Sequence, residues 1–107
     1  MGTTTFIKDE TEFDSLLSSE PLLVVDFTAP WCGPCKVVGP LMDRLAGDYS
    51  DSAKVFKVDL DDNKSMAKRF GIRSIPAVLY FKQGELVKTI VGVKPYEEFS
   101  DTLKEVL

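Results

Sequence analysis

Apolar runs and helical repeats alternate along the chain, beginning with a short apolar pair, Phe6-Ile7, that predicts a first strand. Asp9 and Glu12 then resemble a capping box, which predicts a helix that continues through Leu16-Leu17. Leu22 to Phe27 is a nearly continuous apolar run, which is typical of a central strand buried on both faces. The chain is therefore expected to open as strand, helix and buried strand.

A long helix is predicted after the segment from Thr28 to Cys35, because apolar residues recur there in steps of three and four. The residues on this apolar face are Val38, Leu41, Met42, Leu45 and Tyr49. Lys54 to Leu60 predicts a strand, and the apolar positions between Met66 and Phe70 predict a short helix that Gly71 ends.

Two further strands and a last helix complete the pattern. Ala77 to Phe81 and Leu86 to Val91 flank a turn at residues 82–85, which is typical of a hairpin. Pro95 predicts the first position of a helix whose inward residues are Tyr96, Phe99, Leu103 and Val106. The predicted order is βαβαβαββα, so we expect an α/β domain with one mixed sheet between helices. Strands that alternate with helices imply parallel pairs, and the hairpin adds an antiparallel edge.

Length and composition indicate one domain over residues 1–107, with 44% hydrophobic residues. The formal net charge of −4 and the lack of basic runs argue against nucleic acid or an anionic membrane surface as a partner. No apolar stretch approaches the roughly 20 residues that cross a bilayer, and residues 1–13 lack the layout of a secretion signal. We expect a soluble monomer that binds neither nucleic acid nor membrane.

The two cysteines of the chain, Cys32 and Cys35, lie three positions apart. Disulfides that stabilise secreted scaffolds close long loops, whereas this pair would close almost none. The pair also lies just past a central strand and opens a helix, where unpaired backbone N–H groups and the helix dipole favour a thiolate. Its position therefore indicates chemistry rather than stabilisation.

We expect Cys32 to be the exposed cysteine, with a lowered pKa, and Cys35, one turn further along, to be more buried. Cys32 would attack a substrate disulfide, and Cys35 would then attack the mixed disulfide and release the reduced product. Two other interpretations compete. The pair could be half of a zinc site, although zinc needs four ligands and the chain has no other Cys and no His. The cysteines could also be two inert buried thiols.

The hexapeptide Trp31-Cys32-Gly33-Pro34-Cys35-Lys36 resembles the active-site motif of the thioredoxin family. Further residues that fall where the family pattern places them are Asp26, Pro40, Lys57, Ile75-Pro76, Gly84 and Gly92. The resemblance extends from Phe6 to Leu107, essentially one whole domain. It implies the thioredoxin fold, a five-stranded mixed sheet flanked by four helices. It also implies a redox-active Cys32–Cys35 disulfide, with no further cofactor and no metal.

The resemblance implies a protein thiol–disulfide oxidoreductase that reduces disulfides in target proteins by dithiol–disulfide exchange. Its implied partners are a thioredoxin reductase, which recycles it, and oxidised target proteins. The same fold class also includes disulfide oxidases, disulfide isomerases and binding modules, which remain alternatives. We expect the cytoplasm as its location, or an organelle stroma or matrix if a targeting segment has been removed.

Gly33 and Pro34 are expected to set the redox poise of the pair. They place no side-chain charge between the cysteines, and Pro34 also lacks a backbone N–H. With less stabilisation of the thiolate, the disulfide is comparatively favoured and the dithiol becomes a good electron donor.

Asp26 interrupts the apolar strand, and from the residues alone a buried carboxyl group and a solvated aspartate are equally good interpretations. The resemblance implies that Asp26 is buried with a raised pKa and exchanges a proton with Cys35. Lys57 alternates with Val55 and Asp59, which by itself is typical of a solvated strand face. The resemblance instead places Lys57 near Asp26, where it tunes that carboxyl group.

Most X–Pro bonds in folded proteins are trans, so the residues alone predict a trans bond before Pro76. The resemblance implies a cis Ile75–Pro76 bond, which presents the Ile75 backbone beside Cys32 to an extended substrate segment. It also implies a substrate-binding surface of apolar side chains and exposed backbone around the thiols. The residues of this surface are Trp31, Gly33, Pro34, Ile75, Pro76, Gly92 and Val93.

Overall fold

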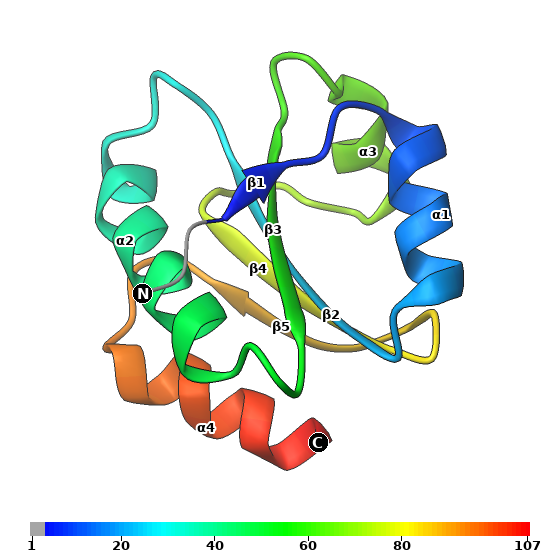
Figure 1. The fold of residues 1–107 in the computed structure, drawn as a ribbon. Helices are drawn as coiled ribbons and strands as arrows, with labels where there is room; N and C mark the ends of the chain where they lie inside the picture. Colours follow the sequence, from blue (N-terminus) through cyan, green and yellow to red (C-terminus); the bar gives the residue numbers. More distant parts are fainter. Residues whose placement is uncertain (1–3) are drawn as a thin grey trace.

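Five strands form one sheet with helices on both faces in the computed structural model, which describes residues 4–107 (Figure 1). The strands are β1 (Thr5–Phe6), β2 (Leu22–Thr28), β3 (Lys54–Asp59), β4 (Ala77–Lys82) and β5 (Glu85–Val91). The helices are α1 (Glu10–Ser19), α2 (Gly33–Asp48), α3 (Lys64–Arg69) and α4 (Tyr96–Val106). The predicted order of elements and the α/β class are confirmed. Positions 1–3 of the predicted domain lie outside the described residues.

The strands lie in the order β1-β3-β2-β4-β5, so β2 is the central strand of the sheet. Both β1 and β2 run parallel to β3. In contrast, β4 runs antiparallel to β2 and to β5. The hairpin therefore forms an antiparallel edge, as predicted. The direction of β4 relative to β2 corrects the prediction, because alternating strands and helices implied a parallel pair.

The shortness of α3 accounts for this reversed direction. A six-residue helix rises only about 9 Å, whereas a six-residue strand such as β3 spans roughly 20 Å. The connection therefore does not return to the start of the sheet, and β4 begins opposite the end of β2, with Ala77 paired to Phe27. The residues that precede β4 are thereby brought to the end of the sheet where β2 finishes and α2 begins.

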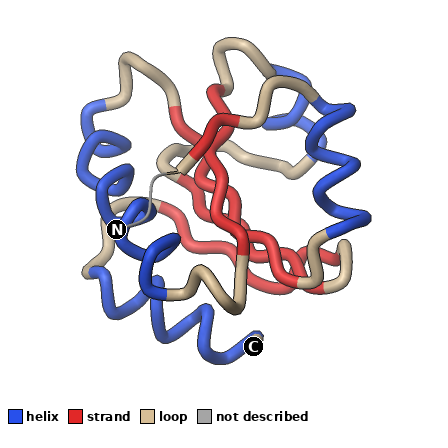
Figure 2. The backbone as a smooth tube through the Cα atoms, viewed as in Figure 1, coloured by secondary structure: helices blue, strands red, loops and turns tan. Residues whose placement is uncertain are grey.

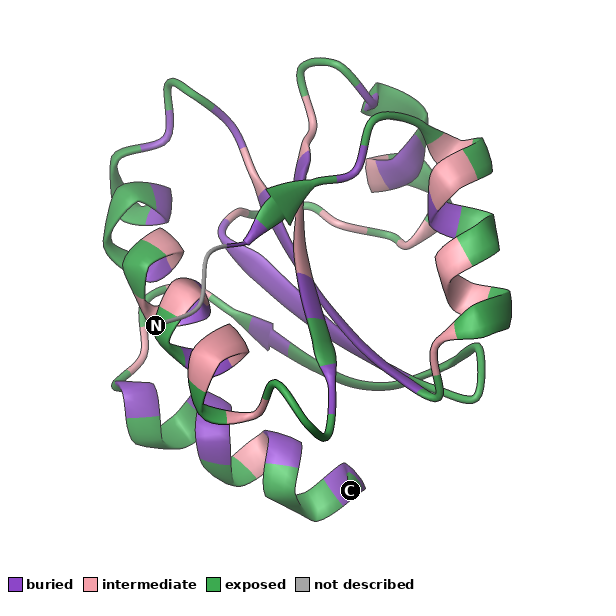
Figure 3. Ribbon diagram, in the orientation of Figure 1, coloured by how far each residue is buried: buried purple, intermediate pink, exposed green. Residues whose placement is uncertain are grey.

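The interior consists of two apolar clusters, one on each side of the sheet. Figure 2 shows helices on both sides of the strands, and Figure 3 shows that the central strands are mostly buried. Val24 of β2 belongs to the cluster covered by α2 and α4, while its neighbours Leu23 and Val25 belong to the cluster covered by α1 and α3. Successive residues of a strand alternate between its faces, so Asp26 lies on the side of α2 and α4. Burial on both faces explains the unbroken apolar run of β2.

Local signals account for where the elements begin. α1 starts at the predicted capping box, where the backbone N–H of Glu12 donates to Asp9 Oδ1 at 2.9 Å. α4 starts one residue later than predicted, because Pro95 is its cap residue. β1 is shifted one residue toward the N-terminus and ends before Ile7, which is buried. Among residues 4–107, no helix is long and apolar enough to cross a membrane.

Phe13 of α1 is a central core residue, and replacing it tests this description. Its side chain is fully buried, and its ring contacts Phe70 and Phe81 edge-on at centroid distances of 5.3 and 5.5 Å. We expect Phe13→Ala to lower the free energy of unfolding by roughly 3–5 kcal/mol, measured by urea denaturation. The matched control is Phe6→Ala, because the Phe6 side chain is 50% exposed. Similar losses in the two variants would contradict the assignment of Phe13 to the core.

Candidate active site

A disulfide joins Cys32, in the turn between β2 and α2, to Cys35 in the first turn of α2. Cys32 is the cap residue of α2, and the two Cα atoms are 5.3 Å apart. The backbone N–H of Cys35 donates to Cys32 Sγ at 3.2 Å. One of the free N–H groups of the helix start is therefore directed at this sulfur, an environment that favours a thiolate when the pair is reduced.

Cys32 and Cys35 are equally buried, at 4% exposure each, so the expectation of an exposed Cys32 is wrong for this oxidised state. Cys32 packs with Ala29 and Ile75, and its sulfur lies 3.9 Å from the carbonyl oxygen of Ile75. Ile75 is 43 positions away in the chain. The helix-start pattern carries no signal of a distant segment that covers the cap residue.

The residues before β4 form the opposite side of the site. The Ile75–Pro76 peptide bond is cis, and Pro76 is buried while Ile75 is half-buried. The carbonyl oxygen of Pro76 accepts a hydrogen bond from the N–H of Gly92 at 2.8 Å. Gly92 has a φ of 92°, a conformation that glycine adopts without strain. The cysteine turn, the Ile75–Pro76 segment and the end of β5 therefore meet at one end of the sheet, where β2 finishes.

Exposed apolar groups surround the disulfide. Trp31 is 70% exposed and Val93 is 48% exposed, and Gly33 and Pro34 are also exposed. Large exposed apolar groups that gather at one place are typical of a partner-binding surface. The structure thus brings together the residues that the family resemblance assigned to substrate binding.

The Trp31 ring has a partner that sequence reasoning missed. Its indole N–H donates to Asp61 Oδ1 at 3.0 Å. The backbone N–H of Asp61 in turn donates to Asp59 Oδ1 at 2.8 Å. Asp61 lies 30 positions from Trp31 in an acidic loop, and charge in a loop is typical of any solvated turn. The hydrogen bond orients a largely solvent-exposed ring beside Cys32.

Asp26 is fully buried in β2, which excludes the solvated aspartate. Neither of its carboxyl oxygens has a hydrogen-bond partner among the described residues. Burial raises the pKa of Asp26 to about 7; the positive charge of Lys57 opposes this rise, and the negative charge of Asp43 adds to it. At neutral pH the carboxyl group is therefore divided between its protonated and ionised forms.

Lys57 lies beside Asp26 in the sheet, because the two residues are paired in the parallel register of β2 and β3. Its ammonium group forms an ion pair with Asp43 of α2, with an Nζ–Oδ1 distance of 3.5 Å. The side chain of Lys57 is only 15% exposed, so it is not part of a solvated strand face. Lys57 thus affects Asp26 through its charge while it is bonded to another carboxylate.

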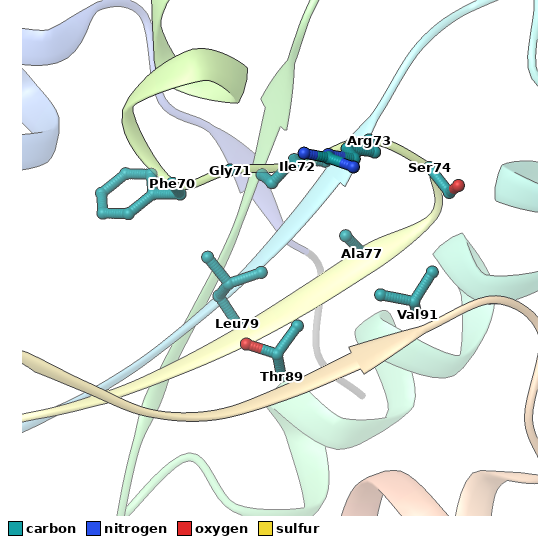
Figure 4. A pocket seen from close by; sticks show the side chains of 9 residues that line it. All are labelled: Phe70, Gly71, Ile72, Arg73, Ser74, Ala77, Leu79, Thr89 and Val91. Atoms are coloured by element: carbon teal, nitrogen blue, oxygen red, sulfur yellow. The ribbon is translucent and has the colours of Figure 1, made fainter.

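Two hollows border the site. One, of about 310 Å³, lies on the β1 side and is lined by Phe6, Thr28, Ala29, Pro30, Cys35, Lys36 and Asp59. The other, of about 200 Å³, lies between β5 and the segment that precedes β4 (Figure 4). Its lining is mostly apolar, and Arg73 supplies a positive charge to it. In the part of the chain that the structure describes, no three His, Cys, Asp or Glu side chains are grouped to hold a metal ion.

Comparison with known proteins gives consistent matches. The family model described as Thioredoxin matches residues 4–105. Thioredoxin 1 from Synechococcus elongatus is 44% identical over 107 residues, which cover the whole of both chains. The chloroplastic thioredoxin M-type from Spinacia oleracea is 41% identical over 101 residues, which are 94% of this chain and 56% of that protein. A crystal structure of Malassezia sympodialis thioredoxin has a TM-score of 0.90 at 30% identity, covering 99% of this chain and 92% of that one.

The burial of Asp26 predicts how stability depends on pH. Its pKa is raised from 3.8 to about 7 by burial, so the folded chain binds more protons than the unfolded chain between these values. The contribution of protonated Asp26 to the free energy of unfolding is complete below about pH 4, and it is lost as the pH rises through 7. We expect the free energy of unfolding to fall over this range by up to roughly 4 kcal/mol relative to Asp26→Asn.

The measurement is chemical denaturation of the oxidised wild type and of Asp26→Asn at several pH values between 4 and 8. The difference between the two curves isolates Asp26, because all other titrating groups are shared. A difference that does not change with pH would show that Asp26 keeps an ordinary pKa in the folded chain.

Proposed function

Because the chain belongs to the thioredoxin family, it is a protein-disulfide reductase, and we propose that Cys32 and Cys35 exchange electrons with its targets. The observation that carries this proposal is the Cys32–Cys35 disulfide at the start of α2, beside the Ile75–Pro76 segment. A bridge between residues three positions apart adds little stability. Its position at a helix N-terminus instead suits a pair that alternates between disulfide and dithiol.

Cys32 is the attacking residue in the reduced chain. Its thiolate attacks one sulfur of the target disulfide, so that a Cys32–target disulfide forms and the other target sulfur leaves as a thiolate. The helix start and the N–H of Cys35, which lies 3.2 Å from Cys32 Sγ, favour the thiolate form of Cys32. Cys32 therefore carries out the first half of the exchange.

Cys35 completes the reaction. Asp26 in its ionised form takes the proton of Cys35, and the Cys35 thiolate attacks Cys32 Sγ, closing the Cys32–Cys35 disulfide. The second target sulfur leaves as a thiolate and receives the proton from Asp26. Two electrons pass to the target. A pKa of about 7 suits Asp26 to this role, because near neutral pH it can both accept and return a proton.

Targets are bound by the surface around the disulfide. An extended target segment would pair with the Ile75 backbone, which lies next to Cys32, in the manner of an added strand. Trp31, Val93 and the backbone at Gly92 would contact apolar side chains of that segment. The hollow between β5 and the segment before β4 (Figure 4) continues this surface and offers room for one further side chain.

The residues between the cysteines favour the reducing direction. Gly33 and Pro34 place no charge beside Cys32, and Pro34 has no backbone N–H to offer. The thiolate is therefore stabilised less than it would be beside a cationic side chain, and the dithiol gives up electrons more readily. This argument weighs against a disulfide oxidase or isomerase.

The chain is further proposed to be recycled by a thioredoxin reductase and to act as a monomer without another cofactor. Its location is proposed to be the cytoplasm or an organelle stroma. Support for the second location comes from the relative in Spinacia oleracea, whose name describes it as chloroplastic.

Replacing each cysteine separately tests their assigned roles. We expect Cys35→Ser to accumulate a mixed disulfide with an oxidised target protein, because the residue that resolves it is missing. Cys32→Ser is expected to form no such adduct and to lose reductase activity. Non-reducing electrophoresis of the adduct is the measurement. Equal trapping by the two variants would overturn the assignment. A chain that reduces no target disulfide, and whose Cys32→Ser variant still binds its partner, would be a binding module.

The direction of electron flow is tested by the midpoint potential of the Cys32–Cys35 couple. Trp31 is the single tryptophan of the chain and neighbours the disulfide, so its fluorescence reports the redox state in defined thiol buffers. We expect a midpoint well below the glutathione poise. A value in the range of protein disulfide isomerase would make the chain an oxidant or isomerase and contradict the argument from Gly33 and Pro34.

A further inference from the structure

The ammonium group of Lys57 forms its ion pair with Asp43 of α2, and not with Asp26, the residue paired with Lys57 in the sheet. Lys57 Nζ lies 3.5 Å from Asp43 Oδ1, and neither oxygen of Asp26 has a hydrogen-bond partner among residues 4–107. We propose that Asp43 is a positioning residue that holds the Lys57 ammonium against α2 and so keeps it from pairing with Asp26. The inference rests on the proposed function, because it matters to the reaction only if Asp26 transfers the proton.

Asp43 is itself held in place by the residue before β1. Both the backbone N–H and the hydroxyl group of Thr4 donate to Asp43 Oδ1, at 3.1 and 2.6 Å. Thr4 is 8% exposed and the Asp43 side chain is 37% exposed, so this contact is partly shielded from water. Partial burial raises the pKa of Asp43, but the bonds from Thr4 and the nearby Lys57 ammonium outweigh it and hold that pKa below its ordinary value. Asp43 therefore stays ionised and available to Lys57.

The surroundings of the Lys57 ammonium agree with this placement. A Cβ atom built on Gly39, one turn before Asp43 on the same face of α2, would lie 3.5 Å from Lys57 Nζ. The ring of Phe6 in β1 lies 5.9 Å from the same nitrogen, on the side of the sheet away from β4. The ammonium group is thus surrounded by α2 and β1, where Asp43 is its anionic partner.

The charged groups that face Asp26 are few, which makes their individual effects measurable. Burial has the largest effect on the pKa of Asp26 and raises it. Of the charged neighbours, Lys57 of β3 lowers this pKa and Asp43 of α2 raises it. The register partner from β4 is Val78, which carries no charge. Asp43 thus raises the pKa of Asp26 in two ways: its own negative charge repels the ionised carboxylate, and it holds the Lys57 ammonium away from that carboxylate.

Asp43→Asn tests the proposal. The variant removes the charge but keeps an oxygen that can accept from Thr4, so the fold is expected to be retained. We expect the ratio of ionised to protonated Asp26 at neutral pH to rise roughly threefold to tenfold. The ratio is measured by NMR titration of the Asp26 carboxyl carbon in the oxidised full chain. An unchanged ratio would overturn the proposal.

A double-mutant cycle separates the two actions of Asp43. In a Lys57→Met background there is no ammonium to retain, so adding Asp43→Asn is expected to change the ratio by a clearly smaller factor. Equal factors in the two backgrounds would mean that Asp43 acts only by direct repulsion, and the positioning role would be overturned. Should Asp43→Asn fold poorly, Thr4→Val is expected to shift the ratio in the same direction by a smaller factor, and no shift would count against the network.

Asp101→Asn is the matched control. Asp101 pairs with Lys104 on the exposed face of α4, and its side chain is 69% exposed. Asp101→Asn changes the net charge by the same amount as Asp43→Asn. It is expected to leave the ratio of ionised to protonated Asp26 and the rate of target reduction unchanged. The pH profile of that rate should move to lower pH in Asp43→Asn alone. If Asp26→Asn reduces targets at the wild-type rate at every pH, proton transfer by Asp26 is wrong, while the NMR titration still decides the role of Asp43.

Discussion

The double pairing of β2 is the constraint on which the rest of the structure depends. The strand is hydrogen-bonded to β3 on one edge and to β4 on the other, and apolar clusters cover both of its faces. It carries Asp26 into the interior and ends just before the turn that presents Cys32. Because β4 begins opposite Phe27, the Ile75–Pro76 segment reaches the end of the sheet where β2 finishes, and it contacts the disulfide there.

The same burial creates the unusual electrostatics of the site. A buried carboxyl group that accepts no hydrogen bond from the described residues is expensive to ionise, and burial raises the pKa of Asp26 to about 7. A lysine next to a buried carboxyl group would ordinarily pair with it and restore a low pKa. In this chain the Lys57 ammonium contacts Asp43 instead, and Asp43 is bonded to Thr4. The interior therefore holds a titratable group near neutrality beside a positive charge that is already paired.

Most of the fold was predictable because its signals are local. The capping box at Asp9 and the buried run of β2 each depend on residues within one element. The direction of β4 was predicted wrongly, since it depends on the length of α3 compared with the length of the sheet. In the site, the cysteine pair was evident from its spacing. The contacts of Trp31 with Asp61 and of Lys57 with Asp43 join residues 30 and 14 positions apart, and no sequence periodicity connects such pairs.

The sequence by itself determined the elements, the redox pair and the family, because these follow from periodicity, capping and a short contiguous motif. Tertiary structure alone decided that Cys32 is buried against Ile75 and that Lys57 forms its ion pair with Asp43. It also decided between a buried and a solvated Asp26, two interpretations that the residues left equal. The physical reason is that burial and ion pairing depend on which distant segments meet, and packing at the edge of the sheet brings these segments together.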